Sequence, residues 1–276
     1  MFPGQPLSYP EFPVQDPVFD SIVSLCAATT GFDLLNPVGA HGSSQLSSSV
    51  KLQLCGVAMS LYHLNRRKLS GEMPDLVCEH SLGIYAALAA CGSLDDSAAL
   101  ELAGRIGTRI AQFGEGCNYA FGSVVGLTEA PLAAIAQNNA VFIVNFNTSR
   151  HFLMCGKRES IDCAVAEAQS AGAFSVTVFA CDAPLHTPFI EEIVGDLEQI
   201  VREFKYFSPR VPLVDHLAQR QLKAADIPLF LVDELCRPVY WDKTFRSIRN
   251  MGVNAFVEVG AGQSLTKFNR WIDSET

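Results

Sequence analysis

A short motif in the first third of the chain carries the residue types of a nucleophilic site. Glu79-His80-Ser81-Leu82-Gly83 follows the apolar run 76–78 and precedes apolar residues at helical spacing. A strand, an x-Ser-x-Gly turn and a helix form a nucleophile elbow, which presents the serine hydroxyl at a helix N-terminus. Gly83 fits, because the second position after the nucleophile must be small. Glu79 does not fit, since glycine is usual there, so the motif also reads as an ordinary N-cap serine.

A serine nucleophile needs a general base, and the sequence contains six histidines. His80 adjoins Ser81, but neighbouring side chains on an elbow point apart. His186 follows a predicted strand and Ala183-Pro184, where a cleft between two domains would form. It is the favoured base, although spacing alone leaves the choice open. The other histidines have no special context: His41, His63, His151 and His216.

Composition limits the possible classes of protein. Hydrophobic residues make up 49 % and charged residues 18 %, which excludes a disordered chain. The net charge of −9 argues against a nucleic-acid-binding surface, and no apolar stretch is long enough for a membrane span. Nine scattered cysteines without a CxxC pair favour reduced thiols and a cytoplasmic location. No ligand cluster suggests a metal site.

The pattern of apolar runs predicts an α/β fold in two parts. Strand and helix patterns alternate as β-α-β-β-α-β, which is typical of a ferredoxin-like unit. We therefore expect a body formed by residues 1–117 and 188–276, with a subdomain inserted at 118–187. A final strand is expected over 255–259. The predicted elements of the insert are 121–125, 130–137, 141–145, 151–155, 161–171 and 174–179.

Six motifs along the chain resemble, in order and spacing, those of the malonyl-CoA:acyl carrier protein transacylase family, which includes the acyltransferases of polyketide synthases. The motifs are Phe2-Pro3-Gly4-Gln5, His80-Ser81-Leu82-Gly83, Asn145-Phe146-Asn147, Ala183-Pro184-Leu185-His186, Pro238-Val239-Tyr240-Trp241 and Glu258-Val259-Gly260-Ala261-Gly262. The resemblance implies an α/β-hydrolase-like body with an inserted ferredoxin-like subdomain. It also implies transfer of malonyl or a related short acyl group from CoA to the phosphopantetheine thiol of an acyl carrier protein. No metal or cofactor is implied; the CoA thioester is a substrate.

The resemblance assigns roles to the site residues. Ser81 matches the nucleophile and His186 the general base, which together form an acyl-serine in a ping-pong reaction. The backbone N–H groups of Gln5 and Leu82 match the oxyanion hole. The backbone carbonyl of Glu234 matches the group that orients the histidine. We expect Ser81 and His186 within about 2.6–3.2 Å of each other.

The chain departs from the family at the acyl pocket. The arginine that pairs with the malonyl carboxylate falls on Ile106 in an ungapped alignment. Arg105 lies one residue early, about 100° away on a helix; Arg109 and Lys51 are alternative cations, or solvated surface charges. The residues expected to bind the acyl group are Ile106, Leu185 and Asn145.

Two other functions remain open. A hydrolase of the same fold would remove acyl groups from carrier proteins, and the loss of the arginine at Ile106 favours it. A catalytically weak binding or scaffold protein is favoured by Glu79. We otherwise expect Glu79 to be accommodated, either near His186 or in a solvated gap, with Glu79→Gly costing less than about tenfold in activity. Docking of an acidic carrier protein would need a local basic patch. The densest basic run is Arg66-Arg67-Lys68; the other candidates are Arg202, Lys205 and Arg210, or Arg246 and Arg249, and such a run also reads as a solvated face.

Overall fold

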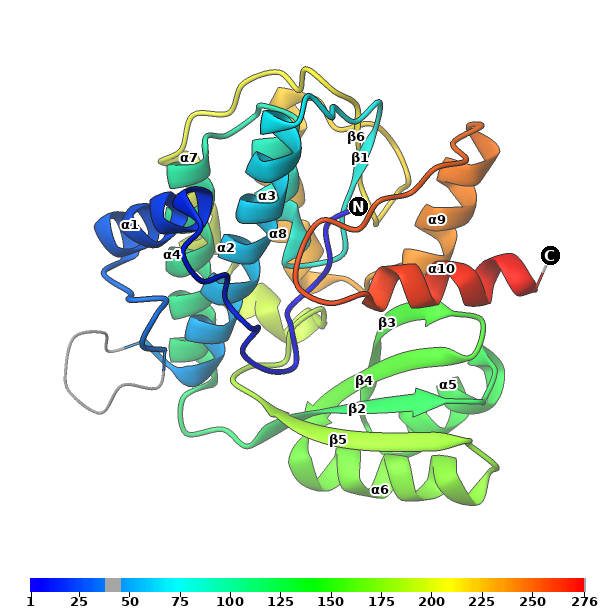
Figure 1. The fold of residues 1–276 in the computed structure, drawn as a ribbon. Coiled ribbons are helices and arrows are strands. Elements are labelled where there is room, and N and C mark those ends of the chain that lie inside the picture. Colours follow the sequence, from blue (N-terminus) through cyan, green and yellow to red (C-terminus); the bar gives the residue numbers. More distant parts are fainter. Residues whose placement is uncertain (38–45, 276) are drawn as a thin grey trace.

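The computed structural model describes residues 1–37 and 46–275. A larger helical body packs against a smaller four-stranded sheet (Figure 1). The helices of the body are α1 (Pro17–Thr30), α2 (Ser48–Leu69), α3 (Gly83–Ala90), α4 (Asp96–Gly114), α7 (Val194–Arg202), α8 (Ile227–Cys236), α9 (Trp241–Asn250) and α10 (Ser264–Ser274). Two short 3₁₀ segments, η1 (Pro188–Ile193) and η2 (Ala224–Asp226), precede α7 and α8.

The core of the body lies between α2, α3 and α4. Every residue of α3 is buried, as its unbroken run of apolar and small residues requires. Polar N-caps begin the surrounding helices: Asp16, Ser47 and Asp95 each accept a backbone N–H from the first turn of α1, α2 and α4. Burial of α3 therefore fixes the segment that directly precedes it, which contains the candidate nucleophile.

A short parallel sheet ends beside α3. Strand β1 (Val77–Cys78) pairs with β6 (Leu213–Val214), with Val77 opposite Leu213 and Cys78 opposite Val214. Phe2 extends the pairing through a parallel bridge to Glu79. The strand predicted over 255–259 is wrong: this segment only exchanges single bonds with Met1, whose nitrogen donates to Val257 O. Isolated hydrogen bonds on one side of this segment do not form the regular ladder that defines a β-strand.

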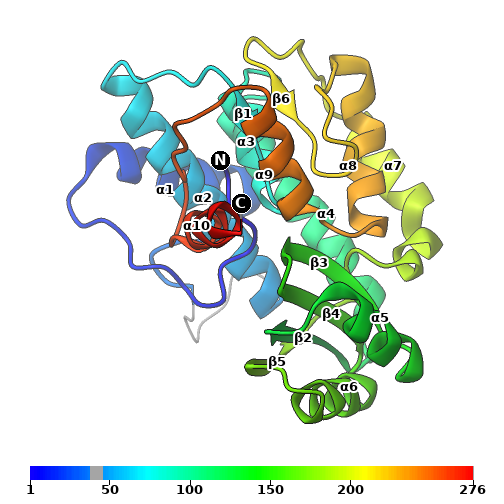
Figure 2. The same cartoon turned by 90° about the vertical axis from the view of Figure 1, so that its right-hand side faces the viewer.

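The smaller sheet has the predicted β-α-β-β-α-β order. Its elements are β2 (Tyr119–Val125), α5 (Glu129–Asn138), β3 (Phe142–Thr148), β4 (His151–Lys157), α6 (Arg158–Ser170) and β5 (Ser175–Cys181). The strand order is β3-β4-β2-β5, with antiparallel neighbours throughout. Helices α5 and α6 cover one face, and the other face turns toward the body (Figures 1 and 2).

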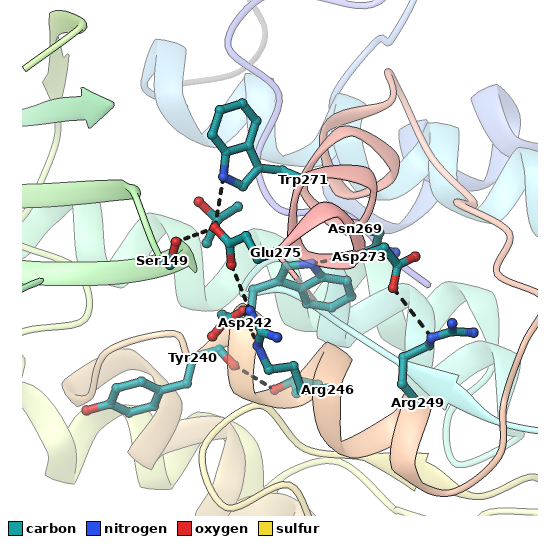
Figure 3. Close-up of polar contacts among 12 residues, drawn as sticks. Ser149, Tyr240, Asp242, Arg246, Arg249, Asn269, Trp271, Asp273 and Glu275 are labelled. Carbon is teal, nitrogen blue, oxygen red and sulfur yellow. Dashed lines mark hydrogen bonds and ion pairs between the residues drawn. The ribbon is translucent and has the colours of Figure 1, made fainter. Parts of the chain in front are cut away.

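The C-terminal helix α10 lies between the body and the smaller sheet (Figure 1). Arg246 of α9 pairs with Asp242 at 2.9 Å and with Glu275, just after α10, at 2.8 Å. Glu275 also bonds Ser149 in the β3–β4 turn and accepts from Trp271 Nε1 (Figure 3). Each exposed pair contributes little stability, but together they fix α10 against both parts. No helix in the described part is long and apolar enough to cross a membrane.

Candidate active site

The turn between β1 and α3 holds Ser81 in a strained backbone conformation. Its φ is 52°, in the left-handed region that serine rarely adopts. The preceding His80 N–H donates to Phe2 O at 3.0 Å, which ties the turn to the N-terminal segment. A Cβ on Gly83 would lie 2.3 Å from that same Phe2 carbonyl oxygen. The local geometry is thus that of a nucleophile elbow, with the small residue where close approach requires it.

Substituting Gly83 tests this close approach. We expect Gly83→Ala to lower the free energy of unfolding by about 2 kcal/mol, because backbone on both sides must shift to admit a methyl group. Urea unfolding measures the change. Gly195→Ala on α7 is the matched control: nothing lies within 4 Å of its added Cβ, so stability should stay equal or rise. Equal effects of the two substitutions would contradict the packing argument.

Ser81 and His186 lie within hydrogen-bonding distance, as expected. Ser81 Oγ is 2.8 Å from His186 Nε2, and His186 Nδ1 is 2.7 Å from the backbone oxygen of Glu234 in α8. A carbonyl oxygen can only accept, so Nδ1 carries the proton and Nε2 is left to accept from the serine hydroxyl. The backbone N–H of His186 also donates to the backbone oxygen of Leu235 at 2.8 Å. The side chain is thereby fixed in the tautomer of a general base.

Burial keeps the imidazole of His186 neutral. The side chain is 4 % exposed. Desolvation lowers its pKa to about 3, and the Glu234 carbonyl only partly opposes the shift. Neutral imidazole, the form that can take a proton from Ser81, therefore predominates throughout the neutral pH range.

A cavity of about 580 Å³ opens in front of this pair, between the body and the smaller sheet. Alternation along the strands directs one set of side chains into it and the other set toward α5 and α6. The strand residues that line it include Phe121, Ser123, Leu153, Thr177 and Phe179. The body contributes residues of α2, α4 and α10 to the opposite wall. The wall is mostly apolar, which suits a short aliphatic chain.

The structure brings some of the predicted acyl-site residues together. Gln5, Asn145 and Leu185 all line the cavity. Leu82 follows the nucleophile directly and is buried. Ile106 departs from the expectation: it is 1 % exposed and packs in the hydrophobic core. Helix α4 instead reaches the cavity wall through the next turn of residues, Gly107, Ile110 and Ala111.

None of the three candidate cations lines this cavity. Arg105 pairs with Glu203 at 2.7 Å, and Arg109 pairs with Asp196 at 2.7 Å. Both arginines border a separate hollow of about 400 Å³ between α4 and α7, because the rotation along α4 turns them away from Ser81. Lys51 is also outside the lining set. Among the described residues, the cavity wall contains no lysine or arginine, and Asp182 is its one carboxylate.

Sequence reasoning missed a second set of buried polar groups around the elbow. His80 Nε2 lies 3.0 Å from Asn147 Oδ1. Glu79 does not point into a solvated gap, as one expectation had it. It is fully buried, with Oε1 2.7 Å from His216 Nδ1. The sequence offered one signal for this contact. The apolar pair Leu213-Val214 is followed by polar residues, just as the apolar run 76–78 is followed by Glu79.

Comparison with known proteins identifies the family. The sequence profile described as "Acyl transferase domain" matches residues 16–269. The chain belongs to this acyl transferase family. The fold is similar to that of solved family members: a malonyl CoA-acyl carrier protein transacylase from Coxiella burnetii has a TM-score of 0.88 at 25 % identity, over 100 % of this chain and 90 % of that one.

Further relatives of this acyl transferase include proteins named for transacylation and for polyketide biosynthesis. The malonyl CoA-acyl carrier protein transacylase of Salmonella typhimurium is 26 % identical over 99 % of this chain and 91 % of its own length. The polyketide biosynthesis protein ThaF of Burkholderia thailandensis is 26 % identical over 92 % of this chain, which spans only 22 % of that longer protein. A type II polyketide malonyl-transacylase, solved in complex with its acyl-carrier protein, has a TM-score of 0.87 at 25 % identity, over 99 % of this chain and 92 % of that chain.

Proposed function

We propose that this acyl transferase moves a short acyl group from CoA to the phosphopantetheine thiol of an acyl carrier protein through an acyl-serine at Ser81. The observation that carries the proposal is the chain of contacts from Ser81 Oγ to His186 and on to the Glu234 carbonyl, at 2.8 and 2.7 Å. The relatives named as transacylases, and the one solved with its carrier protein, support the same acceptor.

The proposed reaction has two half-reactions that balance. In the first, His186 Nε2 takes the Ser81 proton as Oγ attacks the thioester carbonyl; the C–S bond breaks and the CoA sulfur takes the proton from His186. In the second, His186 takes the proton of the incoming thiol, whose sulfur attacks the acyl-serine, and Ser81 Oγ recovers the proton. The backbone N–H groups of Leu82 and Gln5 are the proposed oxyanion donors.

The docking patch predicted at Arg66-Arg67-Lys68 is partly neutralised. Arg66 pairs with Asp16 at 2.9 Å, and Arg67 pairs with Glu72. Two of its three cations thus already have carboxylate partners, which weakens the attraction of this run for an acidic carrier protein.

The cytoplasmic location stays a prediction.

Hydrolysis of carrier-protein thioesters is the second candidate function. The observation that favours it is the cavity wall without a lysine or arginine among the described residues, since the malonyl-binding cation is the feature that separates transferase from hydrolase. In hydrolysis the first half-reaction is unchanged, and water takes the place of the carrier thiol in the second.

Intact mass spectrometry with a panel of malonyl-, acetyl- and butyryl-CoA tests both candidates. For a transferase, we expect one acyl group on the protein, stable without acceptor and discharged onto a carrier protein when that is added. Continuous release of free CoA without acceptor would instead assign the hydrolase. Neither an acyl-enzyme nor CoA release with any thioester of the panel would overturn the proposed transfer from CoA.

A further inference from the structure

A buried acid–imidazole pair, Glu79 and His216, lies beside the Ser81–His186 pair. Glu79 Oε1 and His216 Nδ1 are 2.7 Å apart, and both side chains are fully buried. The pairing of β1 with β6 produces this contact: Cys78 lies opposite Val214, so both strands end side by side. Glu79, directly after β1, thereby meets His216, two residues after β6. An acid and an imidazole that are both out of water need each other as hydrogen-bonding partners.

This pair adjoins both members of the proposed catalytic dyad. Glu79 belongs to the elbow itself, two residues before Ser81, and forms a parallel bridge with Phe2. On the other side, the His216 ring stands at 84° to the ring of His186, with centroids 6.5 Å apart. Glu79 is therefore part of the elbow, and its partner His216 packs edge-on beside the ring of the base.

The elbow and the base both have reason to need such support. Ser81 and His186 each have a left-handed backbone, with φ of 52° and 61°. Strained residues of this kind keep their geometry only when surrounding contacts determine it. A displacement of about 1 Å between reacting groups can cost about a hundredfold in rate. Glu79 lies two residues before Ser81 and is bonded to the histidine that packs beside His186, so it is well placed to prevent such a displacement.

We propose that Glu79, bonded to His216, is a positioning residue for acyl transfer at Ser81. This inference rests on the proposed function. Glu79 does not contact the substrate; it fixes the main chain of the elbow and, through His216, the ring of His186. The glutamate at a position where the elbow motif usually has glycine is thus part of the site, and the scaffold alternative loses its supporting feature.

The test measures reaction of Ser81 with a small serine-directed fluorophosphonate, which needs neither a particular acyl chain nor a carrier protein. We expect Glu79→Leu to lower the maximal labelling rate about 30-fold, with the half-saturating concentration within about twofold, because positioning acts on the reacting groups and not on binding. Glu79→Gln, which still presents an oxygen to His216, should recover the rate to within about threefold of the wild type.

A control separates positioning from general stability. Tyr62→Phe removes the partly buried hydrogen bond from Tyr62 Oη to Asp16. Neither residue lines the cavity, so this substitution should lower stability without changing the labelling rate. If Glu79→Leu does not fold, Glu79→Gly decides: contrary to the expectation from sequence, positioning predicts a fall of more than about tenfold, and a smaller fall would contradict it. A folded Glu79→Leu or Glu79→Gly protein that labels at the wild-type rate would overturn the inference. Wild-type protein that is not labelled at Ser81 would instead overturn the proposed function.

Discussion

Ser81→Ala is expected to abolish acyl-enzyme formation and to lower turnover by at least about four orders of magnitude. The only hydroxyl within reach of His186 Nε2, among the described contacts, is Ser81 Oγ at 2.8 Å. Its removal leaves the base without a nucleophile to activate. Intact mass after incubation with acyl-CoA, together with the rate of transfer to a carrier protein, measures both effects.

His186→Ala should cost nearly as much as Ser81→Ala, and the double substitution should cost no more than the larger single one. Residues that act as a unit are strongly non-additive in this way. Both proteins should keep the unfolding midpoint close to that of the wild type. An acylated Ser81→Ala protein would show that another nucleophile acts, and Cys181, which lines the cavity, is the first thiol to examine.

Malonyl-CoA is expected to react no better than acetyl- or butyryl-CoA. The described cavity wall has no lysine or arginine, and a buried carboxylate without a cation costs several kcal/mol. Butyryl instead gains about 0.8 kcal/mol for each CH₂ that the apolar wall covers. The measurement is kcat/KM for the three thioesters with one carrier protein. A malonyl preference of about a hundredfold, near 2.7 kcal/mol, would require a cation in the site.

A designed arginine provides the complementary test. Ile106→Arg, the substitution that the sequence alone suggests, would place a cation in the core, because Ile106 is 1 % exposed. Ala111→Arg on the same helix points to the cavity wall and should raise the malonyl-to-butyryl ratio of kcat/KM at least about tenfold. Ala111→Met controls for added bulk and should leave the ratio within about threefold. Equal malonyl-to-butyryl ratios for Ala111→Arg and Ala111→Met would contradict the explanation that a missing cation sets the acyl preference.

The smaller sheet could be predicted from sequence because its signals are local. Each strand has its own alternation, and each helix its own apolar spacing, so the order β-α-β-β-α-β followed from short windows. The segment 255–259 has a strand-like sequence as well, but a strand also needs a partner along its length. Its hydrogen bonds join it to Met1, which lies more than two hundred and fifty positions away in the sequence.

The sequence by itself indicated the groups of the proposed chemistry: a serine on a tight turn, a histidine after a strand and an ordered set of motifs, all defined by residue type and local spacing. The tertiary structure decided which side chains line the cavity. Arg105, Arg109 and Ile106 are neighbours on one helix, yet two border a separate hollow and one is buried. It also decided that Glu79 meets His216, 137 residues away. The direction of a side chain depends on what packs against its helix or strand, and that partner is distant in sequence.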